Sequence, residues 1–177
     1  MVVEEHGPRH GRAFTRVLLL AVLVLAGAAA LSACGSAATA GTSRLLDGGV
    51  TAYESKLWDL RGRPIVVNQW ASWCGPCRTE FPIFREQAAK REGQVAFLGV
   101  DAMDVRGAAA AFLDEQPTGY PHFFDKQAKV ARTFGGGRVW PTTAFYDAQG
   151  KVVYARQGAY SDEQDLARDI DRYLLGG

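Results

Sequence analysis

Two cysteines separated by two residues form the most reactive pattern in this chain. Cys74 and Cys77 lie in the stretch Trp73-Cys74-Gly75-Pro76-Cys77, directly after an apolar run. This spacing lets the two sulfur atoms meet in a short disulfide, so the pair is a candidate redox couple. If a helix begins here, its free N–H groups and the positive end of its dipole favour the thiolate of Cys74. Pro76 suits the first turn of such a helix, where its missing N–H does no harm.

Two other interpretations of the cysteine pair are less favoured. A structural zinc site needs four ligands, and after residue 34 the chain offers only this pair and one histidine, His122. A purely structural disulfide would close a very short loop, and the stabilisation that a closed loop gives grows with its length. His122 has aromatic neighbours and is expected to pack in the core or on the surface. The sequence therefore predicts neither a metal site nor a bound cofactor.

The apolar pattern predicts the elements that position the cysteines. Ile65 to Trp70 is a continuous apolar strand with polar Asn68 and Gln69 inside it, as a central strand buried on both faces would show. A helix is expected from Cys77 to about Arg91. The other expected elements are an edge strand over 50–53, a helical turn over 57–60, a strand over 95–100, a helix over 105–116, a short strand over 122–124, a helix over 126–134, a hairpin of strands over 142–146 and 151–156, and a helix over 162–175. Ser161 and Gln164 form a capping box at the start of this last helix. Strands that alternate with helices predict an α/β fold with a mixed, mostly parallel central sheet flanked by helices, and the hairpin gives it an antiparallel edge.

The first 33 residues have the pattern of a secretory signal. Arg9, Arg12 and Arg16 form a basic start, an uncharged apolar run covers 17–30, and small residues follow. The run is short for a membrane span, which needs about 20 apolar residues. Leu31-Ser32-Ala33-Cys34 resembles the lipobox of bacterial lipoproteins, in which the cysteine is lipidated and the signal is cut just before it. An ordinary cleaved signal or an uncleaved anchor is the alternative.

These features divide the chain into three parts. We expect a lipoprotein signal peptide over 1–33, the lipidated Cys34 with a flexible tether over 34–44, and one domain over 45–177. Lipid on Cys34 would anchor the chain to the membrane and leave one clean cysteine pair outside the cytoplasm. The whole chain has 20 Lys and Arg against 19 Asp and Glu, and no charge run suggests nucleic acid as a partner.

Two stretches together resemble the thioredoxin superfamily. They are Asn68-Gln69-Trp70-Ala71-Ser72-Trp73-Cys74-Gly75-Pro76-Cys77 and Trp140-Pro141-Thr142-Thr143. Within the superfamily, the chain is most similar to the membrane-anchored thiol-disulfide oxidoreductases of the TlpA/ResA type, over about residues 50–175. This resemblance implies a thioredoxin fold with an extra strand and helix inserted mid-fold, here over 117–137.

The resemblance also implies roles for individual residues. Cys74 would be the exposed nucleophile, and Cys77 the more buried thiol that resolves the mixed disulfide. Pro141 aligns with the cis-proline that faces the disulfide in this superfamily, although a trans proline is the default for its position in the sequence. Glu80 matches an acidic residue that tunes the thiols and moves a proton to or from Cys77, whereas an exposed glutamate in a first turn is the ordinary alternative.

The sequence departs from the superfamily pattern at two positions. Asn68 stands where cytosolic thioredoxins have a buried aspartate, which shifts the proton transfer to Glu80 or water; a purely structural hydrogen bond of Asn68 within the core is the alternative. Trp140 is larger than the usual residue before the cis-proline, so it either covers Cys74 or stacks on a partner. We expect the surface that meets a partner to include Trp73, Gly75, Pro76 and Trp140.

The leading hypothesis is a thiol-disulfide oxidoreductase on the outer face of the cytoplasmic membrane. Its expected partners are client protein disulfides or dithiols and a membrane thiol electron carrier or oxidant. The spacer Gly75-Pro76 is that of reducing thioredoxins and favours reduction, for example of the haem-site cysteines of apocytochrome c. Oxidation of secreted proteins remains the alternative direction. A copper-binding module and a binding protein with a vestigial motif are the other classes, and copper carriers of this fold use a longer cysteine spacing and a further histidine.

Overall fold

A six-stranded sheet forms the centre of the computed structural model, which describes residues 43–176. The strands lie in the order β1-β4-β3-β2-β5-β6. Their bounds are Leu45–Leu46 for β1, Ile65–Trp70 for β2, Ala96–Ala102 for β3, His122–Asp125 for β4, Thr142–Tyr146 for β5 and Val152–Gln157 for β6. The first four strands in that order, β1, β4, β3 and β2, run parallel to one another. Strand β5 is antiparallel to β2, and β6 is antiparallel to β5. The predicted mixed, mostly parallel sheet with a hairpin at its edge is confirmed.

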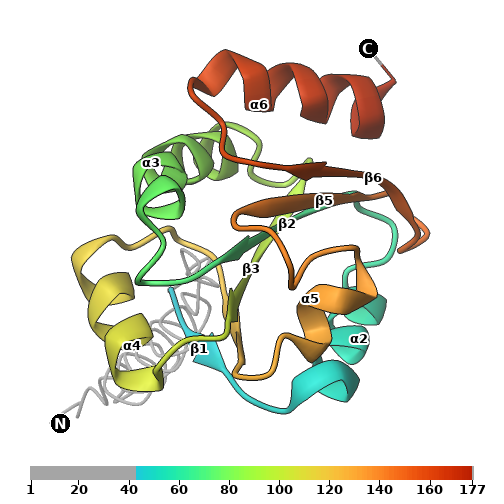
Figure 1. Ribbon diagram of the computed structural model, residues 1–177. Helices are drawn as coiled ribbons and strands as arrows, with labels where there is room; N and C mark the ends of the chain where they lie inside the picture. The colour runs from blue at the N-terminus through green and yellow to red at the C-terminus, as the bar shows by residue number, and fades with distance from the viewer. Residues whose placement is uncertain (1–42, 177) are drawn as a thin grey trace, which may run out of the picture. The chain divides into compact units, whose positions relative to one another are not determined.

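Helices cover both faces of this sheet (Figure 1). Their bounds are Gly49–Asp59 for α2, Gly75–Lys90 for α3, Arg106–Glu115 for α4, Lys129–Thr133 for α5 and Glu163–Ile170 for α6, which continues into a π-helical turn over Asp171–Leu175. Alternate residues of β2 point to opposite faces. Ile65 and Val67 pack into the core on the side of α2 and α5, whereas Val66 and Trp70 pack with α3, α4 and α6. The insert expected over 117–137 contains β4 and α5.

The expected edge strand over 50–53 is wrong, because these residues begin α2. Gly48 and Gly49 both adopt positive φ, 108° and 61°, and this turn redirects the chain from the short β1 into the helix. Tyr53 is fully buried, and its hydroxyl donates to the Tyr146 hydroxyl at 2.9 Å. Packing of this tyrosine under the sheet outweighs the strand propensity of the local sequence.

The start of the last helix also differs from the prediction. Asp162, rather than Ser161, is its N-cap residue, and its carboxylate accepts the N–H of Asp165 at 2.9 Å. An aspartate at this position caps a helix as well as a serine does, so a shift of one residue costs no stability.

The described chain begins with residues that contact the domain. The Ser43 hydroxyl accepts the N–H of Thr118 at 2.6 Å, and the Arg44 carbonyl accepts the N–H of His122 at 2.8 Å. The last two residues of the expected tether therefore contact the loop before β4 and the first residue of β4. Residues 43–176 contain no helix that is long and apolar enough to cross a membrane. The expected signal over 1–33 and the expected lipid site at Cys34 lie outside the described residues.

Candidate redox site

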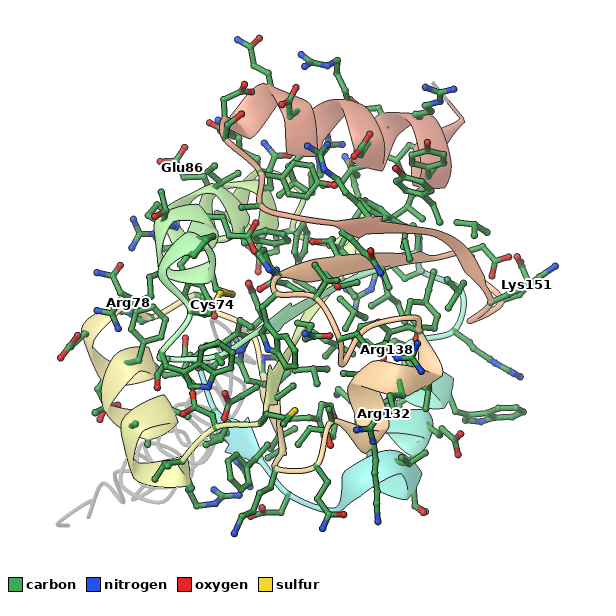
Figure 2. All side chains as sticks on the ribbon, in the orientation of Figure 1. Cys74, Arg78, Glu86, Arg132, Arg138 and Lys151 are labelled. Carbon is green, nitrogen blue, oxygen red and sulfur yellow. A yellow bond between two sulfur atoms is a disulfide. The ribbon has the colours of Figure 1, made fainter. Side chains whose placement is uncertain are left out.

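The two cysteines form a disulfide at the start of α3, which follows β2, an inner strand of the sheet. The Sγ atoms of Cys74 and Cys77 are 2.00 Å apart. Cys74 is the N-cap of α3, and its Sγ accepts the N–H of Cys77 at 3.2 Å. Pro76 lies in the first turn, as predicted. Figure 2 shows Cys74 at this end of α3. The free N–H groups and dipole of the helix therefore act directly on the first sulfur.

Both cysteines are buried in the disulfide state. Cys74 is 4% exposed and Cys77 is 0% exposed. The order of exposure agrees with the prediction, but the expectation that Cys74 is openly exposed is wrong. Its side chain is turned back over the first turn of α3, and the cysteine pair joins an apolar cluster against which Trp140 packs. A partner therefore meets only a small area of Cys74.

Two tryptophans flank the disulfide. Trp73 is 58% exposed, and its ring centroid lies 5.5 Å from that of Trp140. The Trp73 indole donates to the Met103 carbonyl at 3.0 Å, which ties it to the loop after β3. The bond between Trp140 and Pro141 is cis, as the resemblance implied. An aromatic surface thus borders the couple, with Trp140 partly buried and Trp73 open to solvent.

Glu80 lies one helical turn after Cys77 and is fully buried, so the alternative of an exposed glutamate is wrong. Its Oε1 accepts the amide of Asn68 at 2.8 Å, and its Oε2 accepts the N–H of Tyr160 at 3.0 Å. Burial raises the pKa of Glu80 to about 7, although both hydrogen bonds and the charge of Arg156 act to lower it. A group with this pKa accepts and releases protons near neutral pH.

Asn68 can pair with both protonation states of Glu80. Its Nδ2 donates to the carboxylate, and its Oδ1 is buried without a hydrogen-bond partner. A rotation of the amide would present Oδ1 to the proton of the neutral acid. An aspartate here would add a second negative charge beside Glu80. The asparagine found in its place therefore leaves a single carboxyl group to titrate under Cys77.

His122 is a core residue, as expected. One ring nitrogen accepts the Trp70 indole N–H at 3.0 Å, and the other lies 2.8 Å from the Thr118 hydroxyl. Burial lowers the pKa of His122 to about 3, so the ring is neutral. Within residues 43–176, no group of three or more His, Cys, Asp and Glu side chains is arranged to hold a metal ion.

Asp104 supports the loop in front of Cys74, and a second buried aspartate, Asp101, lies near it. The carboxylate of Asp104 accepts the Ser72 N–H at 2.5 Å, the Ser72 hydroxyl at 3.0 Å and the Val105 N–H at 2.6 Å. Asp101, at the end of β3, is fully buried, and neither of its oxygens receives a hydrogen bond. Burial raises the pKa of Asp101 to about 9, the nearby Asp104 and Asp125 act in the same direction, and Arg106 opposes them.

Asp101→Asn is expected to reduce the pH dependence of folding stability. The folded state favours neutral Asp101, so its contribution is fully present below the unfolded pKa, near 3.8, and is lost as the pH rises toward about 9. The wild type should unfold at a lower urea concentration at pH 8.5 than at pH 5, and the variant should show a smaller difference. Asp114→Asn, at an exposed position of α4, is the control and should keep the wild-type difference. Equal differences in wild type and Asp101→Asn would contradict this assignment.

The sequence did not reveal how these buried polar groups pair. Asn68 and Tyr160 reach Glu80 across 12 and 80 residues, and Asp104 reaches Ser72 across 32. The one available signal was the pair of polar residues, Asn68 and Gln69, inside an otherwise apolar strand. It marked a polar role for the strand without naming the partners.

The chain is similar in sequence and in structure to known thiol-disulfide proteins. Residues 43–155 match the AhpC/TSA family. The chain is 34% identical over 119 residues to the thiol-disulfide oxidoreductase ResA of Bacillus anthracis, which covers 65% of this chain and 68% of that protein. The putative thiol:disulfide interchange protein DsbE from Chlorobium tepidum superposes with a TM-score of 0.60 at 30% identity, over 66% of this chain and 84% of that one. A DsbF homologue from Corynebacterium diphtheriae gives 0.61 at 28% identity, over 66% and 75%.

The resemblance to ResA-type proteins and the expected thioredoxin-like fold are thus confirmed. The family match over residues 43–155 includes β2, the cysteine pair, the active-site helix α3 and the segment with the cis-proline. We conclude that this chain belongs to the AhpC/TSA family of thioredoxin-like proteins and is a thiol-disulfide oxidoreductase of the ResA/DsbE type, with Cys74 and Cys77 as its redox couple.

Proposed function

We propose that the protein reduces disulfides of client proteins outside the cytoplasm. The observation that carries this proposal is the Cys74–Cys77 pair at the N-terminus of α3 with a buried Glu80 one turn further on. The reducing direction is supported by the spacer Gly75-Pro76, which is that of reducing thioredoxins. Haem-site cysteines of apocytochrome c are a candidate client within this class.

The two thiols carry the electrons of the reaction. The Cys74 thiolate attacks one sulfur of the client disulfide, forms a mixed disulfide and displaces the other client sulfur as a thiolate, which takes up a proton. The Cys77 thiol then loses its proton and attacks Cys74 Sγ, which releases the second client thiolate. Two electrons pass to the client, and the Cys74–Cys77 disulfide remains. A membrane thiol carrier must reduce it again.

Glu80 is the proposed acceptor of the Cys77 proton. It follows Cys77 by three residues on α3, it is shielded from water, and its pKa of about 7 suits proton transfer near neutral pH. Its negative charge also opposes the formation of a second charge on the buried thiol. Glu80 therefore favours transfer of the proton at the moment of attack over a lasting thiolate at Cys77.

The client is proposed to dock on the surface formed by Trp73, Gly75, Pro76 and Trp140, with Pro141 beside it. Trp73, Gly75 and Pro76 are exposed, and Trp140 packs against the cluster that contains both cysteines. An extended peptide can add to such a surface as a short strand. The aromatic rings would then contact apolar side chains of the client on either side of its disulfide.

Lipid on Cys34 is the proposed anchor on the outer face of the cytoplasmic membrane. The basic start, the apolar run and the lipobox-like Leu31-Ser32-Ala33-Cys34 support this location. In cell fractionation, the protein should sediment with membranes, and mass spectrometry should find Cys34 as its acylated first residue. A membrane-bound protein without acyl groups on Cys34 would contradict a lipid anchor.

Reduction of insulin disulfides, followed by turbidity with a small dithiol as electron source, tests the activity. The purified protein should accelerate precipitation of the insulin B chain well above the dithiol alone. No acceleration would contradict the reducing role. Efficient oxidation of a reduced protein substrate instead would favour the opposite direction.

A further inference from the structure

Gln69 is a fully buried amide that the redox reaction does not use. It lies in β2, one residue before Trp70, and the alternation along the strand points it toward the face covered by α2 and α5. Its neighbours on that face, Ile65 and Val67, are apolar core residues. A buried amide is costly unless its oxygen and nitrogen are both paired, so its partners explain its presence.

Both polar atoms of Gln69 bind one backbone segment far away in the sequence. Its Oε1 accepts the N–H of Gly137 at 2.6 Å, and its Nε2 donates to the carbonyl of Val139 at 3.1 Å. We call residues 135–140 the glycine arm; it connects α5 to Pro141 and contains no helix or strand. One side chain thus fixes the arm through a donor and an acceptor two residues apart, which determines both its position and its direction. Arg138, labelled in Figure 2, belongs to this arm.

The arm has the sequence that such close contact needs. A Cβ atom on Gly136 would lie 2.0 Å from Gln69 Oε1 and 3.1 Å from the Ala131 carbonyl oxygen, so only glycine fits there. Gly137 has a φ of 80°, which other residues rarely adopt. The run of glycines after α5 is therefore complementary to the Gln69 amide, in addition to ending the helix.

The arm ends on the surface next to the couple. Trp140 is its last residue, and its ring packs against the cluster that contains Cys74 and Cys77 and faces Trp73 at 5.5 Å. Val139, whose carbonyl Gln69 holds, exposes 39% of its surface nearby. A shift of the arm would therefore move one wall of the proposed docking surface and leave the cysteines at the start of α3.

We propose that Gln69 is a positioning residue for client binding: its amide holds the glycine arm so that Trp140 forms one side of the surface on which a polypeptide disulfide docks. The inference rests on the proposed function and adds to it the residue that sets the shape of the client site. It acts through Trp140, since the hydrogen bonds of Gln69 go to the arm and not to the sulfur atoms.

The test compares a polypeptide disulfide with a small one. Gln69→Leu leaves the Gly137 N–H without its buried partner and leaves the Val139 carbonyl with only the Thr142 hydroxyl, so the arm should move to find water. We expect kcat/KM for insulin reduction to fall about 10-fold because KM rises. For the small aromatic disulfide DTNB, kcat/KM should change by less than about twofold. The reduction potential should stay at its wild-type value, because the arm does not carry the cysteines. Gln69→Asn keeps the amide on a side chain that is one methylene too short, and it should show the same selective loss. It replaces the leucine variant in the test if that variant folds poorly.

Gln87→Leu is the matched control. Gln87 is also a buried glutamine, but it bonds Glu163 and Arg91 near the far end of α3. It should lose stability and keep both wild-type rates. Equal slowing on insulin and DTNB by the Gln69 variants, or no slowing on either, would overturn the inference. A wild-type protein that reduces neither substrate would instead overturn the proposed function.

Discussion

Cys74→Ser is expected to abolish reduction of protein disulfides, with a loss of at least about a thousandfold in rate. Cys74 is the N-cap of α3 and retains slight exposure, whereas Cys77 has none, so Cys74 is the cysteine that a client can reach. A serine hydroxyl at this position neither ionises near neutral pH nor exchanges with a disulfide. The measurement is insulin reduction by the purified variant.

Cys77→Ser distinguishes the two thiols. Without the resolving thiol, Cys74 should remain bound to the client as a mixed disulfide, which non-reducing electrophoresis and mass spectrometry would detect. Cys34→Ser replaces the remaining cysteine of the chain and should keep full reductase activity. If Cys74→Ser traps clients and Cys77→Ser does not, the assigned roles of the two thiols are reversed.

Glu80→Gln should remove the pH dependence of turnover near neutral pH. The folded protein raises the pKa of Glu80 to about 7, so its carboxylate becomes available as a base as the pH rises through 7. The wild-type rate of insulin reduction should therefore rise with an inflection near pH 7. In the variant we expect a flat profile in this range and a rate at pH 7 lower by about 100-fold, the lower end of what a positioned acid or base contributes.

The glutamine should fit with little rearrangement. Its oxygen can accept the Tyr160 N–H, and its amide can donate to Asn68 Oδ1, which has no partner in the wild type. Glu86→Gln, at an exposed position of the same helix (Figure 2), is the control and should keep the wild-type profile. An inflection near pH 7 that survives in Glu80→Gln would assign the proton transfer to another group.

Local signals in the sequence accounted for the elements around the cysteines. The apolar run of β2 and the helical pattern after Cys77 predicted a strand followed by the active-site helix, and both are present. Signals of this kind depend on neighbouring residues. The prediction of a strand over residues 50–53 was wrong for the same reason. Their local sequence resembles a strand, and the helix is explained by the contact of Tyr53 with Tyr146, which is distant in the sequence.

The chemistry of the site depended more on contacts between distant residues. Glu80 was identified by its position after Cys77, but its burial and raised pKa follow from the elements that cover it, including the backbone of Tyr160. The contact of Gln69 with Gly137 spans 68 residues. No periodicity or motif encodes such a pair, because each residue alone is compatible with many environments. Trp140 likewise needed the structure to show that it packs beside the couple.

The reduction potential of the Cys74–Cys77 pair is the measurement that tests the account most directly. The purified protein would be equilibrated with mixtures of reduced and oxidised glutathione, and the fraction of disulfide would be read by thiol alkylation and mass spectrometry. A reductant of client disulfides should have a potential near or below about −250 mV, in the range of thioredoxin. A potential near about −120 mV, which is that of a strong periplasmic oxidant, would contradict the reducing role.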